Sequence, residues 1–377
     1  MGIDCRDLLP GAQSGIGRFV ENLLRAASLE DNPPPFFLYG NQNTEFPLDA
    51  AWGQPVRAET RWKLEGWTWW WDRFTLPAMA RRDKLDVFLS PYYKAPAIRA
   101  CPVAVTIHDL IFLRLPPALS GRGKLYCRLF RTRARRFAHN AAAVLTVSDH
   151  ARRDIVELLD VPEKKVHVVG HCVGPQYLRV ENPQMLDAVK QVYGIEGEYL
   201  LYVGNFSRHK NVDGLLRTYA RLDPTLQQRV RLVLAGGEGP GLRRVRSVVR
   251  RLRLDHAVRI TGHVEEEHLP ALYSAAAAFV TLTHWEGFGL PVLEAMACGT
   301  PVLCSKRAAL PEVVGDGAVV VDPDDHDACL SALTSILTND SLRAEMRVRG
   351  PARANDFAPR RFARRTLAAL EKAVAGP

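Results

Sequence analysis

Two glutamates, Glu286 and Glu294, flank a Gly-Phe-Gly-Leu-Pro turn. The two glycines of this turn let a backbone approach a ligand closely, and its proline suits the first turn of a helix. We therefore expect a helix to begin near Leu290, with the carboxylate of Glu294 pointing back toward the loop that carries Glu286. The N-terminus of such a helix favours a phosphate or an anionic transition state. Taken alone, Glu294 is better explained as complementing the helix dipole, and Glu286 as a solvated loop residue.

Basic residues stand before a second expected helix, which begins at Val212. Arg208 and Lys210 precede it in the arrangement that holds a pyrophosphate by charge and by backbone N–H groups together. A histidine, His108, follows the expected strand 103–107, and the carboxyl ends of strands in open α/β sheets are where ligands bind. Exposed basic residues and single histidines are more often structural, so these patterns alone leave both interpretations open.

The elements that position these residues follow from the hydrophobic pattern of a chain of 377 residues, of which 47% are hydrophobic and 24% charged. This length exceeds what one core usually holds, so two domains are expected. Short apolar segments alternate with helical patterns, which indicates parallel sheets covered by helices. The expected strands are 85–90, 103–107, 142–147, 166–169, 199–203, 230–235 and 257–261. Helices are expected at 61–74, 150–159, 241–252, 266–276 and 359–375, and another has its apolar face at Phe19, Val20, Leu23 and Leu24.

Cysteine usage and the N-terminal sequence bear on the compartment. The seven cysteines are scattered without a C-x-x-C pair, which is typical of reduced thiols and not of disulfides or a zinc site. The chain opens without the basic and apolar regions of a signal peptide, and its longest apolar stretch, 271–282, is too short to span a bilayer. We expect a cytoplasmic protein, soluble or peripheral on the inner face of the cell membrane.

The net charge of +9 is unevenly distributed. Eight basic residues and no acidic one lie between Leu110 and Ser148: Arg114, Arg122, Lys124, Arg128, Arg131, Arg133, Arg135 and Arg136. A solvated helix face, an anionic membrane surface or a phosphate-bearing substrate would each explain this basic run. Five of the seven tryptophans lie between Trp62 and Trp71 and suit either a membrane interface, an acceptor groove or a core between domains. No nucleic-acid motif accompanies the charge, so no nucleic acid is expected as a partner.

The run E-G-F-G-L-P-x-x-E-A-M-A-C-G-x-P-V resembles the E-x7-E signature of retaining GT-B glycosyltransferases of the family 4 type. The resemblance implies that Glu286 contacts hydroxyls of the donor sugar and that Glu294 contacts the ribose of the nucleotide. The backbone of Gly287, Phe288, Gly289 and Leu290 would lie near the sugar and the phosphate. It also implies two Rossmann-like parallel-sheet domains facing across a cleft: an acceptor domain at 1–180 and a nucleotide-sugar domain at 181–358, with a helix at 359–377 returning to the first.

Other segments extend the resemblance along the chain. G-I-G-R, with Gly15 and Gly17, resembles the family's N-terminal donor-binding motif, and the H-D-L at His108 resembles its cleft histidine. Lys210 matches the lysine that binds donor phosphate. Asn205 stands where the family often has arginine, which leaves Arg208 as the inferred substitute. His263 and Val264 fall where the family lays the nucleotide base against the backbone. The segment G-H-C-V departs from the family's hinge sequence and leaves the role of His171 open.

The activity implied by the resemblance is transfer of a sugar from a nucleotide-sugar donor with retention, by front-face displacement and without a metal or other cofactor. The acids at 322, 324, 325 and 327 are spaced like a turn and a helix cap, so no metal site is predicted. GDP-mannose is favoured as donor, and a glycan or polyprenyl-diphosphate-linked acceptor is expected, because the chain resembles bacterial polysaccharide mannosyltransferases. The alternatives are a nucleotide-sugar epimerase on the same fold and a non-catalytic sugar-nucleotide-binding subunit.

Overall fold

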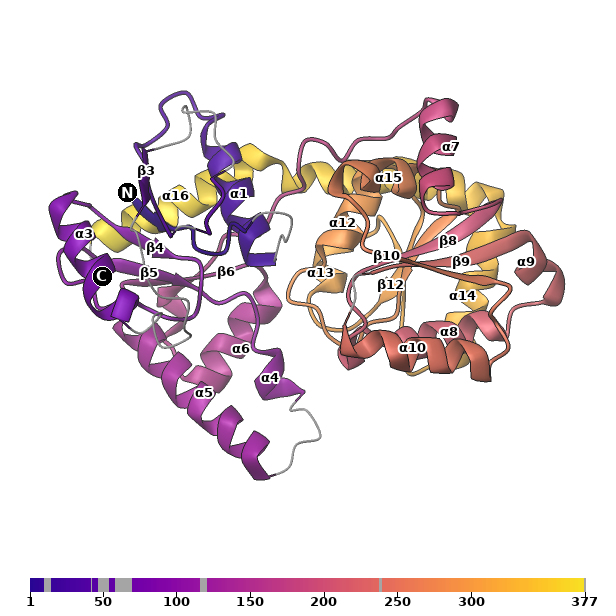
Figure 1. Cartoon of the computed structure of the whole chain (residues 1–377), viewed down its shortest axis with the longest axis horizontal. Coiled ribbons are helices and arrows are strands. Elements are labelled where there is room, and N and C mark those ends of the chain that lie inside the picture. Colours follow the sequence, from indigo (N-terminus) through magenta and orange to yellow (C-terminus); the bar gives the residue numbers. More distant parts are fainter. Residues whose placement is uncertain are drawn as a thin grey trace. The chain divides into compact units, whose positions relative to one another are not determined.

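The computed structural model of the chain describes residues 1–9, 15–41, 43–46, 54–57, 70–115, 121–236 and 239–375. The chain forms two compact units, each built on a parallel sheet (Figure 1). The first unit comprises Met1–Cys172 with Ala358–Pro377, and the second comprises Val173–Phe357. The chain thus passes from one unit to the other at 172/173 and again at 357/358, whereas the sequence-based boundaries are set after residues 180 and 358.

The sheet of the first unit has seven described strands, all parallel, in the order β3-β2-β1-β4-β5-β6-β7. They are β1 (Gly2–Asp4), β2 (Phe37–Gly40), β3 (Gln54–Arg57), β4 (Phe88–Ser90), β5 (Val103–Thr106), β6 (Ala143–Thr146) and β7 (Val166–Val168). The first strand of the chain therefore lies inside the sheet, and later strands are added first on one side of it and then on the other. This is the doubly wound order of Rossmann-like domains.

Helices cover both faces of the first sheet (Figure 1). They are α1 (Gly15–Ala27), α3 (Leu76–Arg82), α4 (Ile111–Arg114), α5 (Gly121–Asn140), α6 (Asp149–Leu159) and α16 (Pro359–Ala375), with short turns η2 (Trp71–Thr75) and η3 (Glu163–Lys165). Helix α1 buries the apolar face predicted for it and packs against α16, so the C-terminal helix belongs to the first unit. Ser148 caps α6 by accepting a hydrogen bond from the Ala151 N–H at 3.0 Å.

The second sheet has the order β10-β9-β8-β11-β12-β13, again all parallel among the described strands. Its strands are β8 (Glu198–Val203), β9 (Val230–Ala235), β10 (Val258–Gly262), β11 (Ala278–Thr281), β12 (Val302–Ser305) and β13 (Val319–Val321). The helices are α7 (Pro183–Val192), α8 (Val212–Ala220), α9 (Pro224–Arg229), α10 (Pro240–Arg251), α11 (Leu269–Ala275), α12 (Leu290–Ala297), α13 (Leu310–Val314), α14 (His326–Thr338) and α15 (Asp340–Ala354), with turns η4 (Arg208–Lys210), η5 (Glu266–His268) and η6 (Asn355–Phe357). Figure 1 shows α12 and α15 on one side of these strands and α8 and α10 on the other.

The sequence predicts most of these elements but shifts some and misses others. The expected strand 85–90 is shorter in the structure, where β4 begins at Phe88 after a turn in which Lys84 has a φ of +49°. Helix 266–276 begins as the turn η5, and α11 starts only at Leu269, with Pro270 in its first turn. Of the expected helix 61–74, residues 61–69 lie outside the described residues. Strands β2, β3 and β11 and helices α3, α4, α7, α9, α13 and α15 were not predicted.

The tryptophan cluster divides where the structure describes it. Trp71 is 3% exposed and belongs to the core of the first unit, where the Arg6 guanidinium lies 5.5 Å from the centre of its ring. Trp70 is exposed and its ring lies 4.4 Å from that of Phe74. Trp62, Trp67 and Trp69 lie outside the described residues. Core packing therefore accounts for one member of the cluster, and an exposed surface for another.

Candidate functional site

The strand order of the second sheet reverses between β8 and β11, which are hydrogen-bonded neighbours. The connections diverge on either side of such a point, and open α/β sheets bind ligands there, outside the carboxyl ends of the strands. The segments that leave β8 and β11 at this edge contain Lys210 and Glu286, two of the predicted catalytic residues. The topology therefore brings together residues that are far apart in the sequence.

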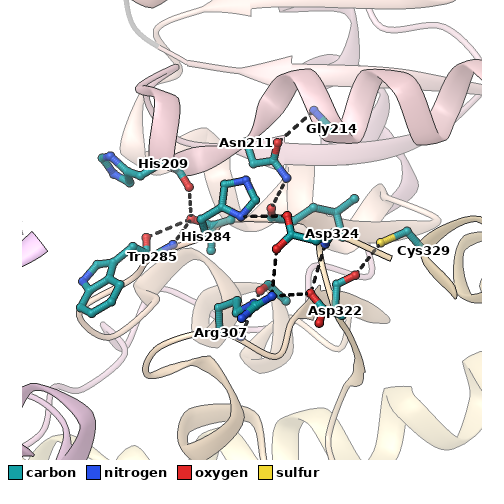
Figure 2. Close-up of polar contacts among 12 residues, drawn as sticks. His209, Asn211, Gly214, His284, Trp285, Arg307, Asp322, Asp324 and Cys329 are labelled. Atoms are coloured by element: carbon teal, nitrogen blue, oxygen red, sulfur yellow. Dashed lines mark hydrogen bonds and ion pairs between the residues drawn. The ribbon is translucent and has the colours of Figure 1, made fainter. Parts of the chain in front are cut away.

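Hydrogen bonds to a single carbonyl group join the two segments (Figure 2). The His209 carbonyl accepts from the His284 N–H at 2.7 Å and from the Thr283 hydroxyl at 2.9 Å. Burial and the positive charge of Lys210 lower the pKa of the His209 imidazole, which favours its neutral form at neutral pH. The two hydrogen bonds to the His209 carbonyl involve only backbone and hydroxyl groups, which do not change with pH.

A left-handed asparagine makes a second connection between the same segments. Asn211 has a φ of +50°, a conformation that asparagine tolerates better than most residues. Its Nδ2 donates to the Leu282 carbonyl at 2.9 Å, while its Oδ1 accepts from the Gly214 N–H at 3.2 Å and caps α8 (Figure 2). One side chain thus fixes both the start of α8 and the end of β11.

Lys210 and Glu286 form an ion pair across this junction, between Lys210 Nζ and Glu286 Oε1. Each side chain is only 16% exposed, so the two charges are partly removed from water and depend on each other. A cationic ammonium and an anionic carboxylate in contact can bind complementary parts of one ligand. The ammonium suits a phosphate, and the carboxylate suits the hydroxyl groups of a sugar.

Helix α12 begins at Leu290, as the sequence predicts. The preceding Gly289 has a φ of +99°, which favours glycine, and a Cβ atom there would lie 2.5 Å from Leu310 Cδ2. Pro291 occupies the first turn, where it sacrifices no hydrogen bond. Pro291 has no N–H and the Val292 N–H donates to the Gly289 carbonyl at 3.0 Å, so the N-terminus of α12 can direct its dipole and the Leu290 N–H toward an anion.

Glu294 lies inside α12 and is 2% exposed. Its Oε2 accepts a hydrogen bond from the hydroxyl of Tyr273, a residue of α11, at 2.9 Å. A buried carboxylate requires such partners, because leaving it without hydrogen bonds costs several kcal/mol. Tyr273 was not among the predicted site residues.

The other predicted donor-binding residues of this unit lie along the same edge of the sheet. Asn205 and Arg208 are exposed after β8, and the Asn205 Oδ1 accepts from the Ser207 N–H at 3.0 Å. His263 is exposed after β10, whereas Val264 is buried. Gly287 and Phe288 lie between Glu286 and α12, and the buried Phe288 ring packs edge-on against Phe357 at 5.6 Å.

The acidic run after β13 serves as a turn and a cap, as predicted. Asp322 Oδ1 accepts from the Asp324 N–H at 3.1 Å, and Asp325 caps α14 by accepting from the Ala328 N–H at 2.9 Å. Arg307 bridges Asp322 and Asp324 at 2.9 and 2.8 Å (Figure 2). No group of three or more His, Cys, Asp or Glu side chains in the described part of the chain is arranged to hold a metal ion.

Three predicted site residues lie in the first unit: Gly15, Gly17 and His108. Gly15 is the first residue of α1 and is exposed, and Gly17 is buried. His108 follows β5 and packs edge-on against Phe19 at 5.0 Å. Its Nε2 lies 3.1 Å from the Pro91 carbonyl oxygen, which can only accept, so Nε2 carries the proton and Nδ1 is an acceptor. Burial lowers the pKa of His108 to about 4, so the ring is neutral at neutral pH.

His171, whose role the sequence left open, has a structural role. It is buried, its ring stacks on Phe362 of α16 at 5.6 Å, and its Nδ1 accepts from the Cys172 N–H at 3.0 Å. Burial and the neighbouring His108 lower the pKa of His171 to about 3. This neutral ring joins the C-terminal helix to the last residues of the first unit.

Comparisons with known proteins show the family of the chain. A family model described as Glycosyltransferase Family 4 matches residues 13–177, and one described as Glycosyl transferases group 1 matches residues 187–353. The chain is 34% identical over 281 residues to the O-antigen chain mannosyltransferase B of Escherichia coli, with 74% of this chain and 73% of that protein covered. The chain belongs to the family 4 type of GT-B glycosyltransferases.

Two further relatives extend the comparison. The chain is 29% identical over 220 residues to the serotype-specific mannosyltransferase WbdA of Escherichia coli, a match that covers 58% of this chain but only 27% of that longer protein. Sucrose-phosphate synthase from Thermosynechococcus elongatus has the same fold, with a TM-score of 0.77 at 18% identity over 99% of this chain and 98% of the other. The GT-B fold, two Rossmann-like domains in one chain, is therefore shown by both sequence and structure.

Residues that sequence reasoning missed in this glycosyltransferase are mostly those that fix the loops. The position of Asn211 could have indicated its role, since an asparagine directly before a helix is a common cap. Thr283 and Tyr273 had none, because each acts through a contact with a segment that is distant in the sequence. The groups that hold the site thus depend on how the strands and helices pack.

The buried histidines of the first unit predict a pH dependence of stability. An unfolded histidine has a pKa near 6.5, and the folded values of about 4 for His108 and about 3 for His171 lie below it. Their contribution to stability is complete above pH 6.5 and is lost as the pH falls toward those values. The variant His171→Asn keeps an acceptor near Nδ1 but has no imidazole. Between pH 6 and 4 the free energy of unfolding of its first unit should decrease less steeply than that of the wild type, by up to about 1.4 kcal/mol per pH unit. Denaturant unfolding at several pH values measures this, and equal slopes for the two proteins would contradict it.

Proposed function

We propose that this glycosyltransferase is a retaining hexosyltransferase that transfers mannose from GDP-mannose to a glycan or a polyprenyl-diphosphate-linked oligosaccharide in cell-surface polysaccharide biosynthesis. The observation that carries the proposal is the contact between Lys210 and Glu286 at the point where the second sheet reverses its strand order. The choice of mannose rests on the two Escherichia coli relatives, both of which are named as mannosyltransferases.

The proposed donor extends along the carboxyl edge of the second sheet. Lys210, Arg208 and the N-terminus of α12 bind its diphosphate, where charge and backbone N–H groups are available together. Glu286 and the backbone from Gly287 to Leu290 contact the sugar, and Glu294 binds the ribose. Asn205 lies beside the phosphates, and His263 and Val264 contact the base. Gly15 and Gly17 stay predicted donor-binding residues, because G-I-G-R resembles the family's N-terminal motif.

The proposed reaction is a front-face displacement in which the acceptor hydroxyl attacks the anomeric carbon as the diphosphate leaves from the same face. The C–O bond to the diphosphate breaks, the bond to the acceptor oxygen forms, and the proton of the acceptor passes to the departing phosphate. Lys210, Arg208 and the α12 dipole stabilise the charge that develops on the leaving group. These groups supply positive charge without a metal, so no cofactor is proposed. His108, a neutral acceptor at Nδ1, binds a hydroxyl of the sugar or the acceptor.

Variants of the two glutamates test this assignment with GDP-mannose and an acceptor glycan. Glu286 meets the sugar as it gains oxocarbenium character, so Glu286→Ala and Glu286→Gln should lower kcat by roughly 10²-fold or more, a loss near 2.7 kcal/mol, with little change in donor KM. Glu294 contacts a group whose charge is constant, so Glu294→Ala should mainly raise the donor KM. The measurement is acceptor-dependent release of GDP.

The same assay separates the proposal from its alternatives. An epimerase would convert the nucleotide sugar without an acceptor, and a non-catalytic subunit would bind it without turnover. Faster release of UDP from UDP-glucose or UDP-GlcNAc than of GDP from GDP-mannose would exclude GDP-mannose as the preferred donor. Turnover lost in Glu294→Ala but kept in Glu286→Ala would reverse the two roles.

We also propose that the first unit binds the cytoplasmic face of an anionic membrane, where a lipid-linked acceptor would be reached. None of the described helices combines the length and the apolar composition that a bilayer-spanning segment requires. The support comes from α5, which leaves large apolar side chains in water. Leu125 and Tyr126 are each 58% exposed and Leu129 is 50% exposed, and Phe112 of the adjoining α4 is 49% exposed.

The basic run around α5 divides into two groups. Arg114 pairs with Asp154 at 2.8 Å and with Glu157, Arg131 Nε donates to the Leu158 carbonyl at 2.8 Å, and Arg135 pairs with Asp160 at 2.6 Å. These three arginines attach α5 and α4 to α6. The side chains of Arg122 and Lys124 lie outside the described part of the structure.

The second group faces solvent with the apolar side chains. Arg128, Arg133 and Arg136 are exposed and make no ion pair with any described residue. Leu125, Leu129, Arg133 and Arg136 are spaced so that they share one face of the helix. A helix face that combines apolar and arginine side chains suits the interface of an anionic membrane, where each arginine contributes about 1 kcal/mol.

Replacing Arg128, Arg133 and Arg136 together by Gln should weaken binding to anionic vesicles by about 3 kcal/mol, or roughly 10²-fold, at low salt. The matched control replaces Arg243, Arg246 and Arg250, which are exposed on α10, where no large apolar side chain is exposed among the described residues. Both triple variants lose three positive charges and so have the same net charge. The control should nevertheless bind anionic vesicles as tightly as the wild-type protein does. Co-sedimentation measures both, and equal losses, or equal binding of the wild-type protein to neutral vesicles, would reject this surface.

A further inference from the structure

The hydroxyl of Tyr273 contacts the carboxylate of Glu294. Glu294 is 2% exposed, and its Oε2 accepts from the Tyr273 Oη at 2.9 Å. The two residues lie on different helices, α11 and α12, so the bond is not a product of local helix geometry. Hydrogen bonds to ionised groups are about twice as strong as neutral ones. This bond therefore limits rotation of the carboxylate about its own axis.

The tyrosine is itself held in one position. It is fully buried, and its ring packs edge-on against Phe279 of β11 at 5.8 Å and against Tyr177 at 6.2 Å. Its backbone carbonyl accepts from the Thr300 hydroxyl at 2.7 Å, and the Thr300 N–H donates to the Ala295 carbonyl at 3.0 Å. The end of α12 is thus attached to the same tyrosine whose hydroxyl reaches Glu294.

We propose that Tyr273 is a positioning residue that holds the carboxylate of Glu294 in the orientation required by the ribose of the donor. The inference rests on the proposed function, because it takes the ribose contact of Glu294 as given. Tyr273 acts through Glu294 and not on the sugar that reacts. Its effect should therefore fall on donor binding in the ground and transition states alike, and appear in KM.

Tyr273→Phe tests the proposal, because it removes the hydroxyl and keeps the ring that packs against Phe279. The variant should raise the donor KM about 10-fold, the factor that corresponds to 1.4 kcal/mol and to the lower range of hydrogen bonds to charged groups, with kcat changed less than about twofold. The matched control is Tyr219→Phe. Tyr219 is also fully buried in the second unit, and its hydroxyl donates to the Val230 carbonyl at 2.8 Å. Tyr219→Phe should leave the donor KM unchanged, even if it lowers the melting temperature by as much as Tyr273→Phe does.

A double-mutant cycle with Glu294→Ala provides the decisive comparison. If Tyr273 acts through Glu294, then Tyr273→Phe should add nothing to the donor KM once the carboxylate is absent. Equal effects of Tyr273→Phe with and without Glu294, or an effect on KM as large in Tyr219→Phe, would overturn the inference. A raised KM in Glu294→Ala but not in Tyr273→Phe would overturn this inference alone. An unchanged KM in Glu294→Ala would overturn the ribose assignment as well.

Discussion

The ion pair between Lys210 and Glu286 depends on the order of strands in the second sheet, and the rest of the site depends on that pair. The two residues meet because β8 and β11 are neighbours although two strands separate them in the sequence. Each side chain is largely buried, so removing either would leave a charge without its partner. In the proposed reaction the diphosphate of the donor becomes the second partner of Lys210, which would leave Glu286 to the sugar.

Backbone geometry fixes the loops on which this pair stands. Gly289 and Asn211 both adopt left-handed conformations, one before α12 and the other before α8. The glycine permits Leu310 to pack closely against it, and the asparagine holds the end of β11 through its side chain. Neither residue needs to touch a ligand to matter, because each sets the direction in which a helix N-terminus points.

Much of the fold could be predicted, because strands and helices have local sequence patterns. Contacts between segments that are distant in the sequence have no such pattern. Alternation of apolar segments and amphipathic helices predicted both parallel sheets, and the turn before Leu290 predicted the start of α12. Strands β2 and β3 were not predicted, because strands of four residues near prolines and turns are too short to show an alternation of apolar and polar residues. The bond from Tyr273 to Glu294 could not be predicted, since it arises from the packing of α11 on α12. The roles of the two glutamates toward a donor stay predictions.

Stabilisation of the second unit by nucleotide sugars tests the central claim most directly, that Lys210 and its surroundings bind the diphosphate of a sugar nucleotide. At 100 times its Kd, GDP-mannose should add about 2.7 kcal/mol to the free energy of unfolding of the unit that contains Lys210, with smaller effects from UDP-glucose and UDP-GlcNAc at equal concentration. Lys210→Met should remove most of this shift at the same donor concentration. Full stabilisation of Lys210→Met by GDP-mannose, or no stabilisation of the wild-type protein by any of these nucleotide sugars, would contradict the account.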